Sequence, residues 1–360
     1  MHKVLVFPRG TNPYQDLLYR RPALRDQFAI RYLDINRYTF PLLPLLLLLQ
    51  RMRGVRVFHI HWPSFAITMP VPFRRHLSYW FVRLCLWSIA ASGMRVVWTV
   101  HNITPHNTET ADDLDIARRL SRLAATKIVH STSTISEMER LGLQTEGCVM
   151  IPHGNYDEVY PNVVSRQDAR AFLDIPGDAR VITFFGNVQP YKNVPAIIDA
   201  YVALRQQYPN LYLLIAGKHN DPAVKQRVQG LDAAAAQGIK LYDRFIADDE
   251  VQHFFNAADV TAFPFTDITT SGSVLLAATF GKPIVAPYIG ALTDIPTEVG
   301  VLYDHADPAG LRKGIATILD DDTARAAMAA AAKRYAATLA WQHIATQTAA
   351  VYDRVINRRT

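Results

Sequence analysis

Short apolar runs alternate with helical patterns along the whole chain, and this alternation limits the possible folds more than any other feature. The runs are rich in β-branched or aromatic residues, end in turn signals and are typical of strands. They span residues 3–7, 28–35, 56–61, 95–101, 127–131, 148–152, 180–185, 212–216, 240–245, 260–265, 283–286 and 301–303. Strands that are separated by helices pair in parallel and are covered on both faces. The sequence therefore predicts an α/β protein with one parallel sheet in each half.

The chain is long enough to form two hydrophobic cores. Its 360 residues exceed the usual size of a single core, and 49% of them are hydrophobic. The polar stretch 153–178 separates the two sets of strands and is interpreted as a linker. An alanine-rich tail is expected to form two helices with a break near Trp341. We predict domains at 1–160 and 161–340 and a C-terminal helix at 341–360.

Cysteine use and the lack of a long apolar run predict a cytoplasmic protein. Cys85 and Cys148 are the only cysteines. Because their spacing fits neither a metal nor a redox motif, both are interpreted as buried thiols in a reducing compartment. Residues 1–8 resemble a strand more than a signal peptide, and no run of about 18 apolar residues exists to span a bilayer.

Basic and apolar residues gather in the first hundred positions. The net charge is +6, the segment 74–87 mixes cations, aromatics and leucines at helical spacing, and the leucine-rich run 40–49 precedes Arg51. Such segments lie on anionic membrane surfaces, which predicts peripheral attachment to the inner face of the plasma membrane. Core helices with basic ends would show the same pattern. Nucleic acid is not an expected partner, since no binding motif accompanies the charge.

Two turns in the second half have the composition of phosphate-binding turns. Residues 269–273 open a helix with small hydroxyl residues, and the free amides of such a helix start bind phosphate. Upstream, Gly186 and Asn187 end an apolar run, and Lys192 follows in the same loop. Two such turns at the carboxyl ends of strands in one α/β domain predict binding of a nucleotide diphosphate.

Several motifs resemble, in order and spacing, those of glycosyltransferase family 4, whose members have the GT-B fold. They are Gly186-Asn-Val-Gln-Pro-Tyr-Lys192, Leu213-Leu-Ile-Ala-Gly-Lys218, Ala257-Ala-Asp-Val-Thr-Ala-Phe-Pro264, Gly281-Lys-Pro-Ile-Val-Ala286 and Ile151-Pro-His-Gly154. The resemblance covers nearly the whole chain. It implies two Rossmann-like domains facing a cleft, the first binding the acceptor and the second the nucleotide sugar. It also implies a C-terminal helix that crosses back and packs on the first domain.

Two segments of the first half narrow the resemblance. His59-Ile-His-Trp-Pro63 and Thr99-Val-His-Asn-Ile-Thr-Pro-His106 are similar to bacterial exopolysaccharide transferases, including xanthan-type mannosyltransferases. This similarity implies a hexosyltransferase that moves a sugar from GDP-mannose or a UDP-sugar to a lipid-linked oligosaccharide or polysaccharide. The nucleotide sugar is the substrate, and no cofactor is expected. Two alternatives stay open: a nucleotide-sugar epimerase of the GT-B fold, and a non-catalytic protein that binds a sugar nucleotide or a glycolipid.

The family pattern is incomplete in this chain. Family 4 enzymes carry two glutamates, eight positions apart, that contact the donor sugar and its ribose, and the matching positions hold Ile268 and Leu276. The family's arginine in the first turn is replaced by Asn187, which removes one phosphate cation. The donor's identity and the retention of stereochemistry therefore do not follow from the resemblance. Asp267 is the carboxylate expected to read the donor sugar instead, with helix capping as its alternative role.

Three residues are candidates for catalysis: Lys192 to neutralise the departing diphosphate, His101 to bond the sugar or act as a base on the acceptor, and Asp267. A surface lysine and a structural histidine are the alternative interpretations of Lys192 and His101. The predicted donor-binding residues are Gly10, Thr11, Gly186, Asn187, Lys192, Gly217, Lys218, Ile246, Thr270, Ser271, Gly272 and Ser273. The predicted acceptor-binding residues are Asn12, Tyr14, His61 and Trp62.

The sequence predicts no metal site. The acidic clusters 248–250 and 320–322 directly precede helical patterns, where helix capping explains them. His59 and His61 have ligand spacing on a strand, but no third ligand is apparent. We therefore predict a metal-independent transferase.

Overall fold

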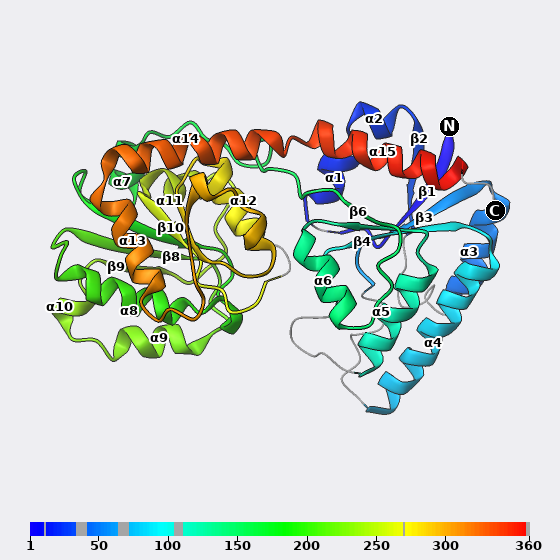
Figure 1. Ribbon diagram of the computed structural model, residues 1–360, viewed down its shortest axis with the longest axis horizontal. Helices are drawn as coiled ribbons and strands as arrows, with labels where there is room; N and C mark the ends of the chain where they lie inside the picture. The colour runs from blue at the N-terminus through cyan, green and yellow to red at the C-terminus, as the bar shows by residue number, and fades with distance from the viewer. Residues whose placement is uncertain (11, 34–41, 64–71, 104–110, 269–270, 358–360) are drawn as a thin grey trace. The chain divides into compact units, whose positions relative to one another are not determined.

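The computed structural model describes the chain apart from residues 11, 34–41, 64–71, 104–110, 269–270 and 358–360 and the side chains of 72–78. The chain divides into two compact units. Unit 1 comprises Met1–Gly154 and Ala340–Thr360, and unit 2 comprises Asn155–Leu339. Each unit contains one six-stranded parallel sheet (Figure 1).

Unit 1 has the strand order β2-β1-β3-β4-β5-β6. Its strands are β1 (His2–Phe7), β2 (Phe28–Tyr32), β3 (Val55–Ile60), β4 (Arg95–Val100), β5 (Thr126–Val129) and β6 (Cys148–Met150). Its helices are α1 (Tyr14–Tyr19), α2 (Pro22–Arg25), α3 (Leu43–Met52), α4 (Pro72–Ala91), α5 (Ala111–Leu123), α6 (Thr132–Arg140) and α15 (Trp341–Asn357). Apolar strand residues such as Phe58 and Trp98 form one core with α3, α4 and α5. The last helix of the chain, α15, packs against α1, α2 and β3, so it belongs to unit 1.

Unit 2 has the strand order β12-β11-β10-β7-β8-β9. Its strands are β7 (Arg180–Phe185), β8 (Leu211–Ala216), β9 (Ile239–Tyr242), β10 (Val260–Ala262), β11 (Ile284–Pro287) and β12 (Gly300–Tyr303). Its helices are α7 (Arg166–Phe172), α8 (Val194–Arg205), α9 (Pro222–Gln229), α10 (Ala233–Ala236), α11 (Val251–Ala257), α12 (Gly272–Thr279), α13 (Gly310–Asp320) and α14 (Asp322–Thr338). The 3-10 helices are η3 (Pro190–Lys192), η4 (Gly290–Asp294) and η5 (Thr297–Val299). A single core that includes Phe184, Ile215 and Val260 holds these elements together.

Both sheets reverse their strand order beside their first strand. β1 lies between β2 and β3, and β7 lies between β8 and β10. In open parallel sheets, ligands bind outside the carboxyl ends of the strands at such a reversal. The loops after β1 and β3 in unit 1, and after β7 and β10 in unit 2, are therefore the first places to look for a site.

The predicted α/β class with two parallel sheets is confirmed, and each predicted strand is present. Several strands end earlier than predicted: β2 ends at Tyr32, β6 at Met150, β9 at Tyr242 and β10 at Ala262. The tail forms the two expected helices, since α14 ends at Thr338 and α15 begins at Trp341.

The interpretation of 153–178 as a linker is wrong. Unit 2 begins at Asn155, whose side-chain amide donates to the carbonyl oxygen of Ala336 at 2.9 Å. The stretch also contains α7, which packs against α11. Arg170 of α7 is 1% exposed, and its guanidinium bonds the Asp259 carboxylate at 2.9 Å. Asn155 and Arg170 are thus paired inside unit 2, and the first boundary lies after Gly154 rather than after residue 160.

Candidate functional site

In unit 2, a lysine lies against the glycine turn at the end of β7. A Cβ placed on Gly186 would lie 3.3 Å from Nζ of Lys192 and 2.5 Å from Oγ of Ser273. Gly186 follows β7, Lys192 ends η3, and Ser273 lies in the first turn of α12. The structure therefore brings three predicted donor-binding residues together from three elements, at the reversal of the sheet.

The Lys192 ammonium is covered but charged. Its side chain is 9% exposed, and burial lowers its pKa to about 8, so it carries its proton at neutral pH. Aromatic rings surround it: Nζ lies 5.9 Å from the ring centroid of Phe184, 5.9 Å from that of Tyr191 and 6.0 Å from that of Phe265. No carboxylate in the described part of the chain forms an ion pair with it. A buried cation without a counter-ion is suited to bind an anionic ligand.

Two glycine turns of this site touch each other. Gly186 and Gly217 follow β7 and β8 and have φ angles of +131° and +137°. A Cβ on Gly217 would lie 2.2 Å from the carbonyl oxygen of Gly186, so no larger residue fits there. The predicted residue Gly217 thus allows the close approach of the two backbones. Its neighbour Lys218 is exposed.

The start of α12 is capped by a serine. Oγ of Ser271 accepts from the amide of Val274 at 3.3 Å. A Cβ on Gly272 would lie 2.7 Å from the hydroxyl of Tyr156, a residue that sequence reasoning missed and that burial holds protonated by raising its pKa. The helix start is therefore closed by Ser271 on one side and crowded by Tyr156 on the other. Ser273 lies in the first turn of α12 and beside Gly186, so the positive end of the helix lies next to Gly186 and Lys192.

The other predicted residues of unit 2 lie in different surroundings. The side chain of Asn187 is exposed, whereas Ile246 is buried in the core. Asp267 is exposed after β10 and does not cap α12, since Ser271 does. Ile268 and Leu276 belong to the core, as their apolar side chains require. Two predicted donor-binding residues, Thr11 and Thr270, lie outside the described residues.

His219 is a further polar residue that the sequence analysis did not select. It follows β8 two residues after Gly217, and its amide donates to Oδ1 of Asp243 at 2.8 Å. Both of its ring nitrogens are buried and have no partner in the part of the chain that the structure describes. Its position just beyond a strand end was the signal available in the sequence.

In unit 1, four histidines follow four neighbouring strands. His61, His101 and His130 are the first residues after β3, β4 and β5, and His153 follows β6. Neighbouring rings in this series lie 5.4, 5.0 and 5.6 Å apart between centroids. Parallel strands bring their carboxyl ends to one edge, which gathers the four rings there. We call these residues the histidine cluster; sequence analysis selected only His61 and His101 from it.

Tyr14 lies at the centre of the histidine cluster. Its ring centroid is between 4.7 and 5.6 Å from the centroids of all four histidines. Oδ1 of Asn12 accepts from the Tyr14 amide at 2.9 Å and so holds the start of α1. Of the predicted acceptor-binding residues, Tyr14 thus lies beside His61 and His101, and its ring is buried.

Trp62 and Gly10 come from the two loops at the reversal of the unit 1 sheet. The Trp62 ring stacks on His101, with 4.5 Å between centroids and 15° between planes. A Cβ on Gly10 would lie 2.6 Å from the Trp62 ring, and the Gly10 amide donates to Oε1 of Gln15 at 2.8 Å. Close packing against Trp62 thus explains why a glycine stands at position 10, whether or not this residue contacts the donor.

A hydrogen-bond network lies beneath the histidine cluster. Nδ1 of His59 lies 2.5 Å from the Tyr352 hydroxyl and 2.9 Å from the Tyr19 hydroxyl. Its Nε2 lies 2.7 Å from Oγ1 of Thr99. The Tyr19 hydroxyl also lies 2.7 Å from Nε2 of His61, which joins the network to the cluster. Because His59 is saturated by these contacts, the structure assigns it a structural role.

The four imidazoles of the histidine cluster are neutral at physiological pH. Burial lowers the pKa of His130 to about 3 and that of His153 to about 4, and it holds the pKa values of His61 and His101 well below their ordinary range. Nδ1 of His130 donates to the carbonyl oxygen of Ile151 at 2.8 Å, so its Nε2 carries the lone pair. That Nε2 has no hydrogen-bond partner among the described residues. A buried lone pair of this kind can accept a hydrogen bond from a hydroxyl group.

These histidines are not arranged as metal ligands. In the described part of the chain, no group of three or more His, Cys, Asp or Glu side chains has the geometry to hold a metal ion. Neutral imidazoles and a stacked indole instead suit a ligand with many hydroxyl groups.

An exposed apolar face covers α3 and α4, which pack against each other. Six exposed side chains form it: Leu45, Leu48, Met52, Trp80, Leu84 and Trp87. The guanidinium of Arg83 lies 4.4 Å from the centroid of the Trp80 ring. None of the helices in the described part of the chain is both long and apolar enough to cross a bilayer.

Two parallel six-stranded sheets and a last helix that returns to the first unit define the GT-B class of proteins. The solved structure of Anabaena HepE in complex with UDP and glucose is similar to this chain, with a TM-score of 0.74, 18% identity and coverage of 98% of this chain and 100% of HepE. Sucrose-phosphate synthase from Thermosynechococcus elongatus gives a TM-score of 0.74 at 18% identity, with full coverage of both chains. At these identities the likeness concerns the fold, and the GT-B fold is confirmed.

A family model described as glycosyl transferases group 1 matches residues 179–321 of the chain. A GDP-mannose:glycolipid 4-beta-D-mannosyltransferase of Xanthomonas campestris is 25% identical over 85% of this chain and 79% of the relative. A D-inositol 3-phosphate glycosyltransferase of Salinispora tropica is 30% identical over 52% of this chain, and the match spans only 41% of that relative. The resemblance to glycosyltransferases is confirmed, and these findings support a glycosyltransferase.

Proposed function

We propose that this protein transfers a hexose from a nucleotide-diphosphate sugar to a lipid-linked glycan in bacterial exopolysaccharide synthesis. The observation that carries the proposal is the Lys192 ammonium, buried without a counter-ion beside Gly186 and the start of α12. In glycosyl transfer the leaving nucleotide diphosphate gains charge while the anomeric carbon becomes cationic, so fixed positive groups at the phosphates stabilise the transition state. Lys192 and the α12 amides are the groups of unit 2 suited to this role.

The donor proposed first is GDP-mannose. Support comes from the activity for which the Xanthomonas relative is named, since the match to that relative covers 85% of this chain. A UDP-sugar is the second choice, because the HepE structures contain UDP and UDP-glucose. We propose that the reaction needs neither a metal ion nor a cofactor, since Lys192 supplies the positive charge at the leaving group.

Unit 1 is proposed to bind the acceptor glycan. The half-buried Trp62 offers a flat ring on which a sugar can stack, and the neutral imidazoles of His101 and His130 can accept hydrogen bonds from sugar hydroxyls. His101 is the proposed group that positions the attacking hydroxyl. Asp267 is proposed to contact the donor sugar, because its carboxylate is exposed after β10 and does not cap α12.

The proposed place of the reaction is the inner face of the plasma membrane. The exposed apolar face of α3 and α4, together with the net charge of +6, suits contact with an anionic lipid surface. This location would also give access to an acceptor that is held in the membrane by its lipid.

Two measurements on the full chain test the proposal. A thermal-shift panel of UDP-, GDP- and ADP-sugars should show stabilisation by one nucleotide class, because a bound ligand raises apparent stability by mass action. Transfer from that donor to a lipid-linked oligosaccharide should then fall about a hundredfold or more in Lys192→Ala. The matched control is Lys313→Ala, which removes an exposed lysine that pairs with Asp307.

Three outcomes would contradict the proposal. Conversion of the sugar nucleotide without any acceptor would indicate an epimerase. Nucleotide binding without turnover would indicate a non-catalytic binding protein. Transfer in Lys192→Ala within threefold of the wild type would remove Lys192 from the mechanism.

A further inference from the structure

A chain of hydrogen bonds runs through unit 1 toward the histidine cluster. It begins on β4, where Oγ1 of Thr99 lies 2.7 Å from Nε2 of His59. From Nδ1 of His59 it continues to the hydroxyl of Tyr352 on α15 at 2.5 Å, and that hydroxyl lies 3.2 Å from the hydroxyl of Tyr19 on α1. All four side chains are buried, so each of their protons needs an acceptor inside the protein.

The chain ends at His101. The Tyr19 hydroxyl lies 2.7 Å from Nε2 of His61, and Nδ1 of His61 lies 3.2 Å from Nε2 of His101. The other ring nitrogen of His101, Nδ1, has no hydrogen-bond partner among the described residues. A neutral imidazole can donate or accept through such a nitrogen, and the position of its single proton decides which.

The Thr99 hydroxyl sets the direction at the start of the chain. In the described structure its partner is Nε2 of His59, so its proton either goes to that nitrogen or stays buried without an acceptor. A buried donor without an acceptor loses the full hydration of the group, so Thr99 donates to His59. Burial lowers the pKa of His59 to about 3 and keeps its ring neutral. The proton of His59 therefore lies on Nδ1 and is donated to the Tyr352 hydroxyl.

This direction continues to the end of the chain. The Tyr352 hydroxyl, which accepts on one side, donates to the Tyr19 oxygen, and the Tyr19 hydroxyl donates to Nε2 of His61. Burial holds the pKa of His61 well below its ordinary range, so the ring is neutral and its proton lies on Nδ1, which donates to Nε2 of His101. His101 is neutral for the same reason, so its own proton lies on the unpartnered Nδ1.

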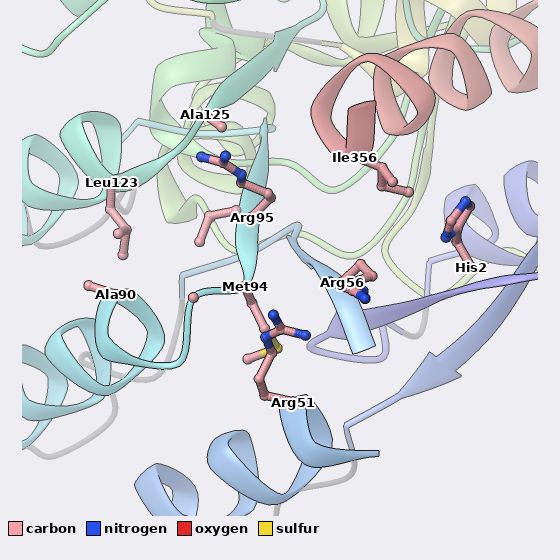
Figure 2. A pocket seen from close by; sticks show the side chains of 11 residues that line it. His2, Arg51, Arg56, Ala90, Met94, Arg95, Leu123, Ala125 and Ile356 are labelled. Carbon is pink, nitrogen blue, oxygen red and sulfur yellow. The ribbon is translucent and has the colours of Figure 1, made fainter. Parts of the chain in front are cut away.

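The arginines of β3 and β4 lie too far away to reverse this direction. Figure 2 shows Arg56 and Arg95 beside a pocket that they line at the amino ends of the two strands. His61 and His101 follow the carboxyl ends, and each strand has six residues, so about 20 Å separates the two ends at roughly 3.3 Å per residue. Charges in contact with solvent are largely screened over that distance.

His101 and its neighbour His130 thus present opposite hydrogen-bonding groups. Nδ1 of His130 donates to the carbonyl oxygen of Ile151, which leaves a buried lone pair on its Nε2 without a partner in the described structure. The two rings lie 5.0 Å apart between centroids. An N–H donor and a lone pair on neighbouring rings match a hydroxyl group, which accepts and donates hydrogen bonds at one oxygen.

We propose that Nδ1 of His101 donates a hydrogen bond to a hydroxyl oxygen of the acceptor glycan and that Nε2 of His130 accepts the proton of the same hydroxyl. This inference rests on the proposed function, which supplies the glycan as the ligand. Tyr19 and His61 are positioning residues in this arrangement. They act through His101, because they keep its proton on the nitrogen that faces no other partner.

Nitrogen NMR of the histidine rings in the full chain tests where the proton lies. In the wild type at pH 7.5 His101 should carry it on Nδ1, and His101→Asn identifies the signal by its loss. His61→Leu removes the N–H that bonds Nε2 of His101, so the proton should then be shared between the two nitrogens. His61→Gln should restore the wild-type position, since the new amide can accept from Tyr19 and donate to His101. Tyr79→Phe is the control, because it removes a hydroxyl of unit 1 that bonds Asp115 at 2.8 Å and should leave the signal unchanged.

Transfer measurements on the same samples separate this inference from the proposed function. For His61→Leu, kcat/KM for the acceptor should fall about tenfold while KM for the nucleotide sugar stays unchanged, and His61→Gln should recover most of the loss. A wild-type His101 with its proton on Nε2, or a His61→Leu spectrum equal to that of the wild type, would overturn the inference even where transfer is observed. The wild-type spectrum alone decides the position of the proton, so the test does not depend on the folding of a variant. Absence of transfer in the wild type would instead overturn the proposed function, and the glycan ligand of the two histidines with it.

Discussion

At the scale of single residues, Lys192 owes its proposed role to its surroundings. Aromatic rings and the Gly186 turn remove water from its ammonium group, and burial brings its pKa down to about 8. A lysine on the surface would keep its charge far above that pH. The binding of a diphosphate should therefore depend on pH in a range where surface lysines do not titrate.

Donor affinity should fall as the pH rises above about 8. Below that value Lys192 is protonated and attracts the diphosphate, and above it the folded protein loses this charge. Each further pH unit should weaken the binding of GDP or UDP up to about tenfold. This fall ends where the pH passes the pKa that Lys192 has in the complex, which the bound diphosphate raises. Calorimetric titration at pH 7, 8 and 9 measures this slope.

The variant Lys192→Arg is the control for this pH dependence. Arginine keeps its proton over the whole range, so its diphosphate affinity should be nearly constant between pH 7 and 9. A wild-type affinity that is equally constant would show that Lys192 does not contact the diphosphate.

A second prediction concerns Asp267, the carboxylate proposed to replace the missing glutamates. Asp267→Asn should lower transfer at least about tenfold, because a neutral amide bonds the donor hydroxyls more weakly than a carboxylate does. The melting temperature should stay nearly unchanged, since Ser271 and not Asp267 caps α12. Steady-state transfer rates and thermal unfolding of the same samples measure both effects.

Asp248→Asn is the matched control for Asp267→Asn, since Asp248 is an exposed aspartate elsewhere in unit 2. Unchanged transfer in Asp267→Asn would leave recognition of the donor sugar to other residues. A joint loss of transfer and stability would instead indicate a structural role.

The sequence was informative about residues whose role follows from a strand end. Lys192, Gly186 and Ser273 lie together, because turns that follow neighbouring strands of one parallel sheet meet at the same edge. The sequence could not predict the contact of Tyr19 with Tyr352, because these residues are 333 positions apart and meet only through the return of α15. Nor could it predict that Gly10 makes room for Trp62.

At the scale of helices, the sequence of α3 and α4 allowed two interpretations, core helices or helices with an exposed apolar face, and the structure shows both features. Leu43 and Leu47 of α3 are buried in the core of unit 1, whereas Leu45 and Leu48 are exposed. The helices therefore cover the sheet and also present an apolar outer surface. The sequence predicted the helical apolar pattern, but it could not say how much of the pattern the core would bury.

Replacement of Trp87 tests the proposed membrane contact. The wild-type protein should sediment with anionic vesicles and dissociate as salt rises, because screening weakens its attraction to the surface. Trp87→Ser should weaken that binding about tenfold, since it removes apolar area worth roughly 1.5 kcal/mol or more when buried in lipid. The free energy of unfolding should hardly change, because the side chain is exposed.

Val163→Ser is the control for Trp87→Ser, because Val163 is also an exposed apolar residue but lies in unit 2. Vesicle binding that is equal for both variants, or equal on neutral and anionic lipid, would argue against a membrane role for the α3 and α4 face.

At the scale of the whole molecule, the two units differ in how they should respond to acid. Unit 1 contains four buried histidines, His59, His61, His101 and His130, and the half-buried His153, and desolvation lowers the pKa values of all five. All five tryptophans of the chain also lie in unit 1. Tryptophan fluorescence therefore reports the unfolding of unit 1 alone.

Unit 1 should lose stability as the pH falls below about 6.5. Above that value the histidines are neutral in the folded and the unfolded chain, so they add no pH dependence. Below it the histidines of the unfolded chain become protonated, whereas those of the folded unit bind protons only at pH about 3 to 4. Each such histidine lowers the free energy of unfolding by about 1.4 kcal/mol per pH unit. Urea unfolding followed by tryptophan fluorescence at pH 7.5, 6.5 and 5.5 measures the slope.

One substitution within the cluster identifies the source of this slope. His130→Asn keeps a donor for the carbonyl oxygen of Ile151 but cannot take up a proton, so it should reduce the slope by about 1.4 kcal/mol per pH unit. If unit 1 unfolds at the same urea concentration at pH 7.5 and 5.5, the histidines cannot be buried in the neutral form. In that case they would be charged groups of the site, and the neutral-imidazole account of acceptor binding would fail with them.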